Sequence, residues 1–302
     1  MYHLATVFPP AARLRRLPLS RDQLMLLLAA INQLFLGVDI YLAHSISGTI
    51  NGSEWIPIIF GFSAGIILLL AGLIALRNRP LATILANLVF VVSIVIGLMG
   101  VFFHLVRAGI IGGGSPLSDS VGLLVWAPPF LGPIAFVLVG ALGISAAWVE
   151  DPPDSGRLRL LANRHLQLPY SKTRAYFLIV GIFALITVIS STFDHARTNF
   201  ANPAVWLPAS VGVFATAVAI ALGFMAKPSQ SDLTTYTLAM VMMIVVGLVG
   251  ALLHLNSNLV AQGTIVVERF VRGSPLLAPL LYANVGLLGL VTLLDPTEHS
   301  SK

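Results

Sequence analysis

The chain has 302 residues, of which 57% are hydrophobic and only 10% are charged, and its mean hydropathy is +0.92. A soluble domain carries about 45–50% apolar and about 25% charged residues, so this composition predicts an integral membrane protein. Because the sequence contains no Cys, it excludes disulfides, Cys-held iron–sulfur clusters and covalently attached c-type haem. The formal charge of +5 does not indicate nucleic-acid binding, since the basic residues are spread through short segments between apolar runs.

Eight apolar stretches are long enough to cross a membrane, because about 20 apolar residues in a helix span roughly 30 Å of hydrocarbon. They cover residues 23–44, 56–76, 81–106, 122–148, 174–195, 204–226, 232–255 and 275–294. The stretches are continuously apolar and do not alternate with a period of two, so lipid-facing strands are not expected. The predicted fold is therefore an all-α integral membrane protein with eight transmembrane helices.

The basic residues are distributed unevenly between the two sides of this arrangement. If the N-terminus is cytoplasmic, 13 of the 17 Lys and Arg residues lie on the cytoplasmic side and four lie outside. This is the positive-inside pattern, so we expect a multi-pass protein of a cell membrane, of bacterial type, with both termini in the cytoplasm. Its expected partners are the lipid bilayer and further protein subunits.

The two halves of the chain repeat each other. Trp-Ile-Pro at 55–57 matches Trp-Leu-Pro at 206–208 with an offset of 151 residues, and segment 97–105 matches 247–255 with an offset of 150. Because each copy contains an even number of spans, both copies enter the membrane from the same side. We therefore expect two parallel four-helix repeats, related by a pseudo-twofold axis along the membrane normal.

This repeat defines the expected domain organisation. Residues 1–149 form the first four-helix repeat with a basic cytoplasmic N-terminus, 150–173 form a cytoplasmic linker, and 174–302 form the second repeat. Within the repeats, Ala127-Pro128 of the fourth span is matched to Ala278-Pro279 of the eighth.

Four of the seven His residues lie at the ends of the first, third, fifth and seventh spans, namely His44, His104, His195 and His254. Those spans run in the same direction, so all four imidazoles are expected near the outer membrane face. By repeat, His44 corresponds to His195 and His104 to His254. Two imidazoles at equal depth on neighbouring helices can bind one metal, and a low-spin haem b iron takes two such axial ligands.

Glycine and arginine residues near the histidines fit the same hypothesis. Gly100 and Gly250 lie four residues before the His of the third and seventh spans, on the same helical face, where they leave room for a macrocycle. Arg107 and Arg197 lie within three residues of a candidate His, and a planar guanidinium is suited to pair with a haem propionate.

Two carboxylates lie near the outer ends of the spans. Asp39 is five residues before His44, and Asp194 directly precedes His195. Because ionisable residues are costly in a membrane, both are candidates for proton carriers or for hydrogen-bond partners of a ligand His. The repeat has Ser190 at the position of Asp39, so the two halves are not chemically equivalent.

Several alternatives remain open at this point, because no motif identifies a substrate or a reaction. Histidine also occurs at membrane interfaces and small residues also serve close helix packing. A single copper or zinc ion on all four imidazoles is another possibility. The leading hypothesis is an electron-transfer subunit with one or two b-type haems near the outer face, exchanging electrons with quinone or an outer redox partner. The alternatives are a cofactor-free or pigment-binding accessory subunit, or scaffold, of a larger complex, and a transporter or metal-handling permease.

Overall fold

The computed structural model describes residues 7, 19–46, 48–75, 77–113, 120–126, 129–160, 164–259 and 267–295. It is predominantly helical, as expected for an all-α membrane protein. Six helices in this part of the chain are long and apolar enough to cross a membrane. They are α2 (Arg21–Ser45), α3 (Trp55–Ala75), α4 (Arg79–Arg107), α7 (Lys172–Ala196), α8 (Trp206–Phe224, after the short 3-10 helix η4 at Pro203–Val205) and α9 (Gln230–Leu259).

The fourth and eighth expected spans are shorter than the sequence predicted. The stretch 122–148 forms two helices, α5 (Ser120–Trp126) and α6 (Leu131–Ala147), and the stretch 275–294 forms α11 (Leu277–Thr292), with α10 (Val267–Arg272) before it. At 17 and 16 residues, α6 and α11 are about 26 and about 24 Å long. Pro133 and Pro279 lie in their first turns, where a missing backbone N–H costs little.

The expected match of Ala127-Pro128 to Ala278-Pro279 involves residues 127 and 128, which lie outside the described residues. The described contacts instead relate Pro133 to Pro279, because the first packs against Gly100 and the second against Gly250.

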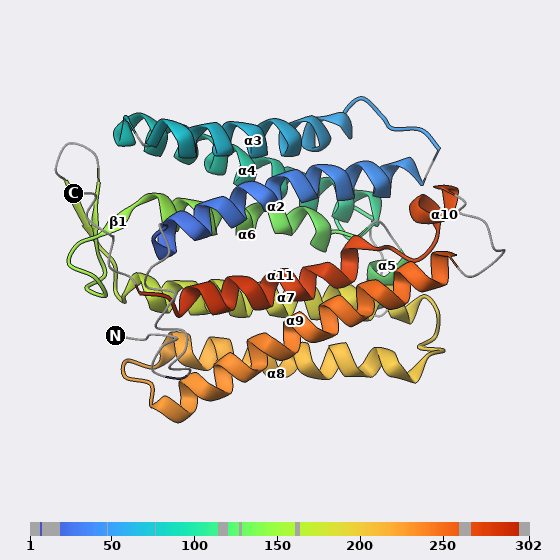
Figure 1. Ribbon diagram of the computed structural model, residues 1–302. Helices are drawn as coiled ribbons and strands as arrows, with labels where there is room; N and C mark the ends of the chain where they lie inside the picture. The colour runs from blue at the N-terminus through green and yellow to red at the C-terminus, as the bar shows by residue number, and fades with distance from the viewer. Residues whose placement is uncertain are drawn as a thin grey trace.

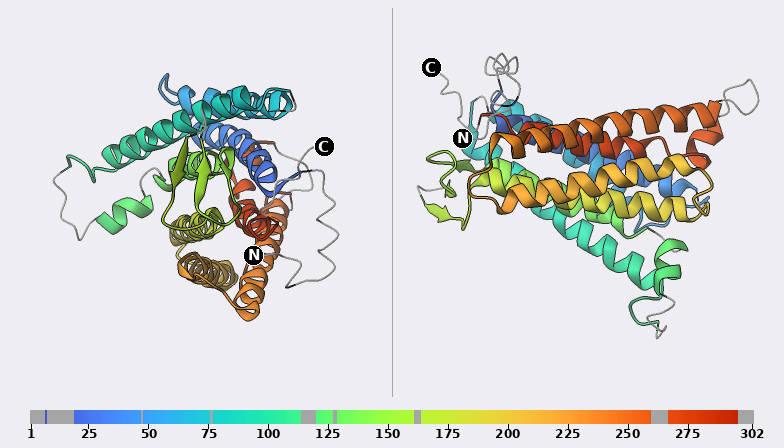
Figure 2. Two further views of the ribbon diagram at one scale, coloured as in Figure 1. Left: turned by 90° about the vertical axis from the view of Figure 1, so that its left-hand side faces the viewer. Right: turned by 90° about the horizontal axis from the view of Figure 1, so that it is seen from below.

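The helices pack in two groups of four, which lie side by side (Figure 1). Most of the axes run roughly along one direction, whereas α4 is clearly tilted against the others (Figure 2). In the first group, α2 packs on α3, α3 on α4, α4 on α6 and α6 on α2. In the second group, α7, α8, α9 and α11 pack in the same cyclic order. The two groups contact each other through α6 with α7 and through α2 with α11, as the end-on view shows (Figure 2).

The distribution of apolar side chains fits contact with lipid. Large apolar residues such as Leu73, Leu88 and Leu252 are exposed on the outer faces of the long helices. The centre is filled by buried side chains, including Phe177 and Met240. A soluble protein rarely exposes apolar surface so continuously, so we conclude that the chain is a multi-pass membrane protein that contacts the bilayer.

The expected linker 150–173 contains a small antiparallel sheet, which the sequence did not predict. Strands β1 (Val149–Glu150), β2 (Arg157–Arg159) and β3 (His165–Gln167) pair in chain order. The buried carboxylate of Glu150 accepts hydrogen bonds from the backbone N–H groups of Gly156 at 2.7 Å and of Lys172 at 2.9 Å. This carboxylate therefore ties the sheet to the start of α7.

The starts of α2 and α7 are capped alike and joined by buried charges. Ser20 and Ser171, which are 151 residues apart, accept hydrogen bonds from backbone N–H groups in the first turns of their helices. Lys172, which is fully buried, donates to the carboxylate of Asp22, and Arg21 donates to the Thr173 hydroxyl at 2.6 Å. The two helices, one from each half, are thus joined at this end by reciprocal contacts.

Candidate functional site

The first pair of candidate histidines meets at the end of the first helix group that lies away from the sheet. His44 is in the last turn of α2 and His104 is in the last turn of α4, and these helices lie diagonally across the group. Their ring centroids are 6.2 Å apart, with an angle of 75° between the ring planes. Both residues are half-buried.

The second helix group carries the matching arrangement. His195 is in the last turn of α7, and His254 lies near the end of α9, again on diagonal helices. Their ring centroids are 6.4 Å apart, with 83° between the planes. The structure therefore brings the four histidines together as two similar pairs, each contained within one half of the chain.

In each pair, one imidazole is oriented by the backbone carbonyl oxygen of a proline that precedes a helix. His104 Nδ1 lies 3.0 Å from the Pro129 carbonyl oxygen before α6, and His254 Nδ1 lies 2.8 Å from the Pro275 carbonyl oxygen before α11. A carbonyl oxygen only accepts, so Nδ1 carries the proton in both residues. Their Nε2 lone pairs are consequently available to a ligand or metal.

The second imidazole of the first pair has a carboxylate beside it that the sequence analysis missed. Glu54, directly before α3, places Oε1 at 3.4 Å from His44 Nδ1 and 3.7 Å from the Arg107 guanidinium. Asn51 donates to Glu54 from its backbone N–H at 2.8 Å and from its side-chain amide at 3.1 Å. The available signal was the position of Glu54 directly before the Trp-Ile-Pro repeat motif, where the second copy has Val205.

The environment of Glu54 favours the ionised carboxylate. Partial desolvation raises its pKa, but the hydrogen bonds from Asn51 and the nearby His44 and Arg107 outweigh this effect and lower the pKa below its usual value. Glu54 is therefore negatively charged at neutral pH.

The glycine faces expected to leave room for a macrocycle are used for helix packing. A Cβ atom at Gly100 would lie 2.8 Å from the Pro133 side chain, and one at Gly250 would lie 3.0 Å from the Pro279 side chain. The glycines one turn earlier, Gly97 and Gly247, are still closer to the backbone of the neighbouring helix. These residues bring α4 onto α6 and α9 onto α11, which fixes the helices that carry His104 and His254.

The two arginines expected near haem propionates have protein partners. The Arg107 side chain is exposed and lies beside Glu54. Arg197 donates from Nε to the Val125 carbonyl oxygen in α5 at 2.7 Å, so it joins the second half to a short helix of the first. Their pairing with propionates stays a prediction.

The two aspartates lie on α2 and α7, the helices that the buried charges join at the opposite end. Asp39 is exposed on the protein surface and Asp194 is half-buried, and their carboxyl groups are near enough to interact electrostatically across the two halves. Asp194 also interacts electrostatically with His195 and Arg197. The carboxylate that contacts the His44 ring is Glu54 and not Asp39.

A single metal on four imidazoles is not assembled. In the described part of the chain, no group of three or more His, Asp or Glu side chains is arranged to hold a metal ion. The two pairs are therefore separate, and a metal bound to either pair would need its remaining ligands from a prosthetic group.

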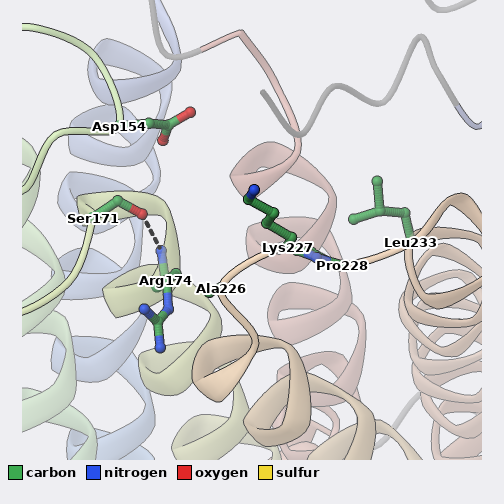
Figure 3. Close-up of a pocket in the computed structure, with 7 residues that line it drawn as sticks. All are labelled: Asp154, Ser171, Arg174, Ala226, Lys227, Pro228 and Leu233. Atoms are coloured by element: carbon green, nitrogen blue, oxygen red, sulfur yellow. Dashed lines mark hydrogen bonds between the residues drawn. The ribbon is translucent and has the colours of Figure 1, made fainter.

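A hollow lies at the opposite, sheet-bearing end of the molecule (Figure 3). It is lined by Asp154, Ser171, Arg174, Ala226, Lys227, Pro228 and Leu233. The Arg174 guanidinium donates to the carbonyl oxygens of Gly223 and Phe224 at 2.9 Å each, so it satisfies the last carbonyls of α8. We assign this arginine a structural role.

No protein-family model, curated protein or solved structure matches the chain.

Proposed function

We propose that the protein is a membrane electron-transfer subunit that holds two b-type haems, one between His44 and His104 and one between His195 and His254. The observation that carries this proposal is the spacing of both pairs, 6.2 and 6.4 Å between ring centroids. Two imidazoles that bind one metal from opposite sides at about 2.0–2.1 Å per nitrogen have centroids roughly 6 Å apart.

The orientation of the rings supports the same assignment. In His104 and His254 the Nδ1 proton is held by a carbonyl, which leaves Nε2 to coordinate. Metal-binding His residues usually have such a partner on the other ring nitrogen, because it fixes the tautomer and the orientation of the ring. A bound haem would supply one-electron chemistry. The four histidines would hold the iron of the two haems, and Arg107 and Arg197 would have to exchange their present protein partners for the propionates.

We further propose that the chain forms eight transmembrane helices as two parallel four-helix repeats, with a pseudo-twofold axis along the membrane normal. This is supported by the matching packing order of the two helix groups and by the paired contacts between them. The short helices support the same pseudo-twofold symmetry, since α5 of the first half packs on α7 and α10 of the second half packs on α2. The shorter α6 and α11 fit a locally thinned or partly covered outer half of the bilayer.

The proposed orientation places both termini and the sheet in the cytoplasm and the histidine pairs near the outer face of the cell membrane. It rests on the distribution of 13 basic residues on one side against four on the other. Electrons would then be exchanged with quinone in the bilayer or with a redox partner on the outer side.

An absorption spectrum combined with iron analysis tests the function. Protein purified in mild detergent from haem-replete cells is expected to show a Soret band that changes on reduction with dithionite, and two irons per chain. A preparation without Soret absorbance, which also takes up no haem b when titrated with it, would remove the proposal.

An accessory subunit without a cofactor is the second candidate, and the close packing at the glycines favours it. Gly97 and Gly247 leave no free face on the inner parts of α4 and α9, as expected for helices selected for tight packing. This candidate predicts normal assembly and stability after His-to-Ala substitution at all four positions. A transporter would instead depend on Asp39 and Asp194, the carboxylates that interact across the two halves.

A further inference from the structure

The hollow at the sheet-bearing end has opposite charges in its lining (Figure 3). Its volume is about 550 Å³, and it lies between the turn after β1, the start of α7 and the loop from α8 to α9. Asp154 contributes a carboxylate from the turn, and Lys227 contributes an ammonium from the loop. In the described part of the chain, neither group forms an ion pair.

The loop that carries Lys227 is held in one conformation by its neighbours. The Met225 N–H donates to the last carbonyls of α8, and Pro228 directly follows Lys227. The backbone N–H and the hydroxyl of Ser229 both donate to the Asp232 carboxylate at 2.7 Å. The Lys227 side chain is exposed and forms no hydrogen bond within the described residues, so its ammonium is available to a ligand.

The groups on the α7 side of the hollow are also fixed. The Asp154 Oδ1 atom accepts from the Thr173 hydroxyl at 2.6 Å, and this hydroxyl accepts from Arg21 at 2.6 Å. The Ser171 hydroxyl oxygen accepts from the backbone N–H of Arg174, which leaves the hydroxyl hydrogen to donate. The lining therefore offers a hydroxyl donor and an ammonium for an anion, and a carboxylate oxygen for a cation.

The hollow lies at the depth where the membrane-spanning helices end. Helix α8 ends at Phe224 and α9 begins at Gln230. The Phe224 side chain is 71% exposed, while its carbonyl oxygen accepts from Arg174 of the hollow at 2.9 Å. Apolar surface of the kind that faces lipid thus begins directly beside the charged lining, as expected at the boundary between acyl chains and headgroups.

We infer that this hollow binds a phospholipid whose headgroup carries both a phosphate and a primary ammonium, namely phosphatidylethanolamine. Lys227 and Ser171 donate to the phosphate, Asp154 accepts from the ammonium, and the acyl chains lie along the surface at Phe224. A headgroup with a net negative charge is disfavoured by the Asp154 carboxylate, and the quaternary ammonium of choline has no N–H to donate. The site lies at the opposite end from the histidine pairs, so it does not depend on the proposed function.

Lipid titration tests this inference on the full-length protein. After delipidation in detergent, the protein is titrated with short-chain phosphatidylethanolamine, phosphatidylcholine and phosphatidylglycerol, and bound lipid is counted by native mass spectrometry. Phosphatidylethanolamine is expected to bind about tenfold more tightly than the other two. Equal affinities, or a preference for phosphatidylglycerol, would overturn the assignment of the headgroup.

Three substitutions separate the contributions of the lining. Lys227→Gln is expected to weaken all three lipids by about tenfold, because they share the phosphate. Asp154→Asn keeps an oxygen for the Thr173 hydroxyl and is expected to remove the preference for phosphatidylethanolamine. Arg77→Gln is the matched control, because it removes an exposed positive charge from the corresponding loop of the first half, between α3 and α4.

The control and a soluble headgroup complete the test. Arg77→Gln is expected to leave the three affinities unchanged, and an effect equal to that of Lys227→Gln would show general attraction of lipid to basic loops. Soluble phosphoethanolamine is expected to bind more weakly than the lipid, because it has no acyl chains to contact Phe224. Equal binding of the soluble compound would overturn the assignment to a lipid.

Discussion

At the scale of single residues, the polar side chains at the two ends of the helices have different roles. At the end with the sheet they form closed contacts: Lys172 and Asp22 are buried together, and Tyr176 donates to the Asp22 carboxylate at 3.0 Å. At the other end, Nδ1 of His104 and of His254 points at a backbone carbonyl oxygen, which leaves the Nε2 lone pair of these two rings for a ligand. The first set joins the two halves, whereas the second set is the one that we propose to hold a cofactor.

The buried ion pair should be sensitive to the loss of one partner. Asp22→Asn leaves the Lys172 ammonium, whose side chain is 0% exposed, without its counter-charge, and such a loss costs about 3–5 kcal/mol. We expect a clear decrease in the thermal unfolding midpoint of the detergent-solubilised protein. The double variant Asp22→Asn with Lys172→Met should recover part of this loss, because it removes the buried ammonium while the amide oxygen still accepts from Arg21 and Tyr176. A single variant as stable as the wild type would contradict the assigned role.

The histidine pairs could be proposed from the sequence, because a His at equal depth in matched spans is an unusual pattern in apolar helices. Glu54 could not be, because it lies in a loop and its contact with His44 depends on how the chain enters α3. Asp39 is closer to His44 in the sequence than Glu54 is, but the carboxylate that contacts the His44 ring is that of Glu54.

At the scale of helices, the glycines decide how closely neighbours approach. A Cβ atom at Gly97 would lie 2.7 Å from Val137 Cγ2 and 2.8 Å from the Pro133 carbonyl oxygen, and the second contact is with backbone. The expected open face is thus occupied by α6. Hydropathy alone could not distinguish a glycine that leaves room for a macrocycle from one that allows close helix packing, since both require a small residue on one helical face.

Replacing this glycine should push α4 away from α6. Gly97→Ala is expected to destabilise the protein by about 1–3 kcal/mol, the usual cost of overpacking. Gly72→Ala is the matched control on α3, because a Cβ atom there meets nothing within 4 Å. Unfolding in mixed detergent and SDS compares the variants, and equal stability of the two would show that the α4–α6 contact is not tight.

The predicted length of the fourth span was wrong because an apolar run was taken as one helix. Pro129 and Pro133 follow α5 closely, and the chain starts a new helix at Leu131. The sheet in the linker was missed for another reason: strands of two and three residues are too short to show a period-two pattern.

At the scale of the whole molecule, the sheet and the histidine pairs lie at opposite ends of the long helices (Figure 1). The sequence predicted a membrane protein correctly, because its apolar runs exceed what a soluble core needs. The similar packing of the two helix groups could be expected from the repeated motifs. The differences between the halves follow from individual substitutions, such as Val205 at the position of Glu54.

Cysteine labelling tests the proposed orientation on this Cys-free background. Gly52→Cys lies in the exposed loop before α3, and Leu166→Cys lies in strand β3, where the native side chain is 48% exposed. In intact cells, a membrane-impermeant maleimide is expected to modify position 52 only, and position 166 only after lysis. The opposite pattern would invert the topology and place the histidine pairs on the cytoplasmic side.

The proposed function requires two separate haem centres, and the absorption spectra of two single variants test for them. After reconstitution with haem b, His104→Ala is expected to lose the first centre and retain the second, so that it binds one haem where the wild type binds two. His254→Ala is expected to do the converse, because each pair lies within its own half of the chain. Spectra identical to that of the wild type for both variants, or loss of all haem from either one, would exclude two independent haem centres.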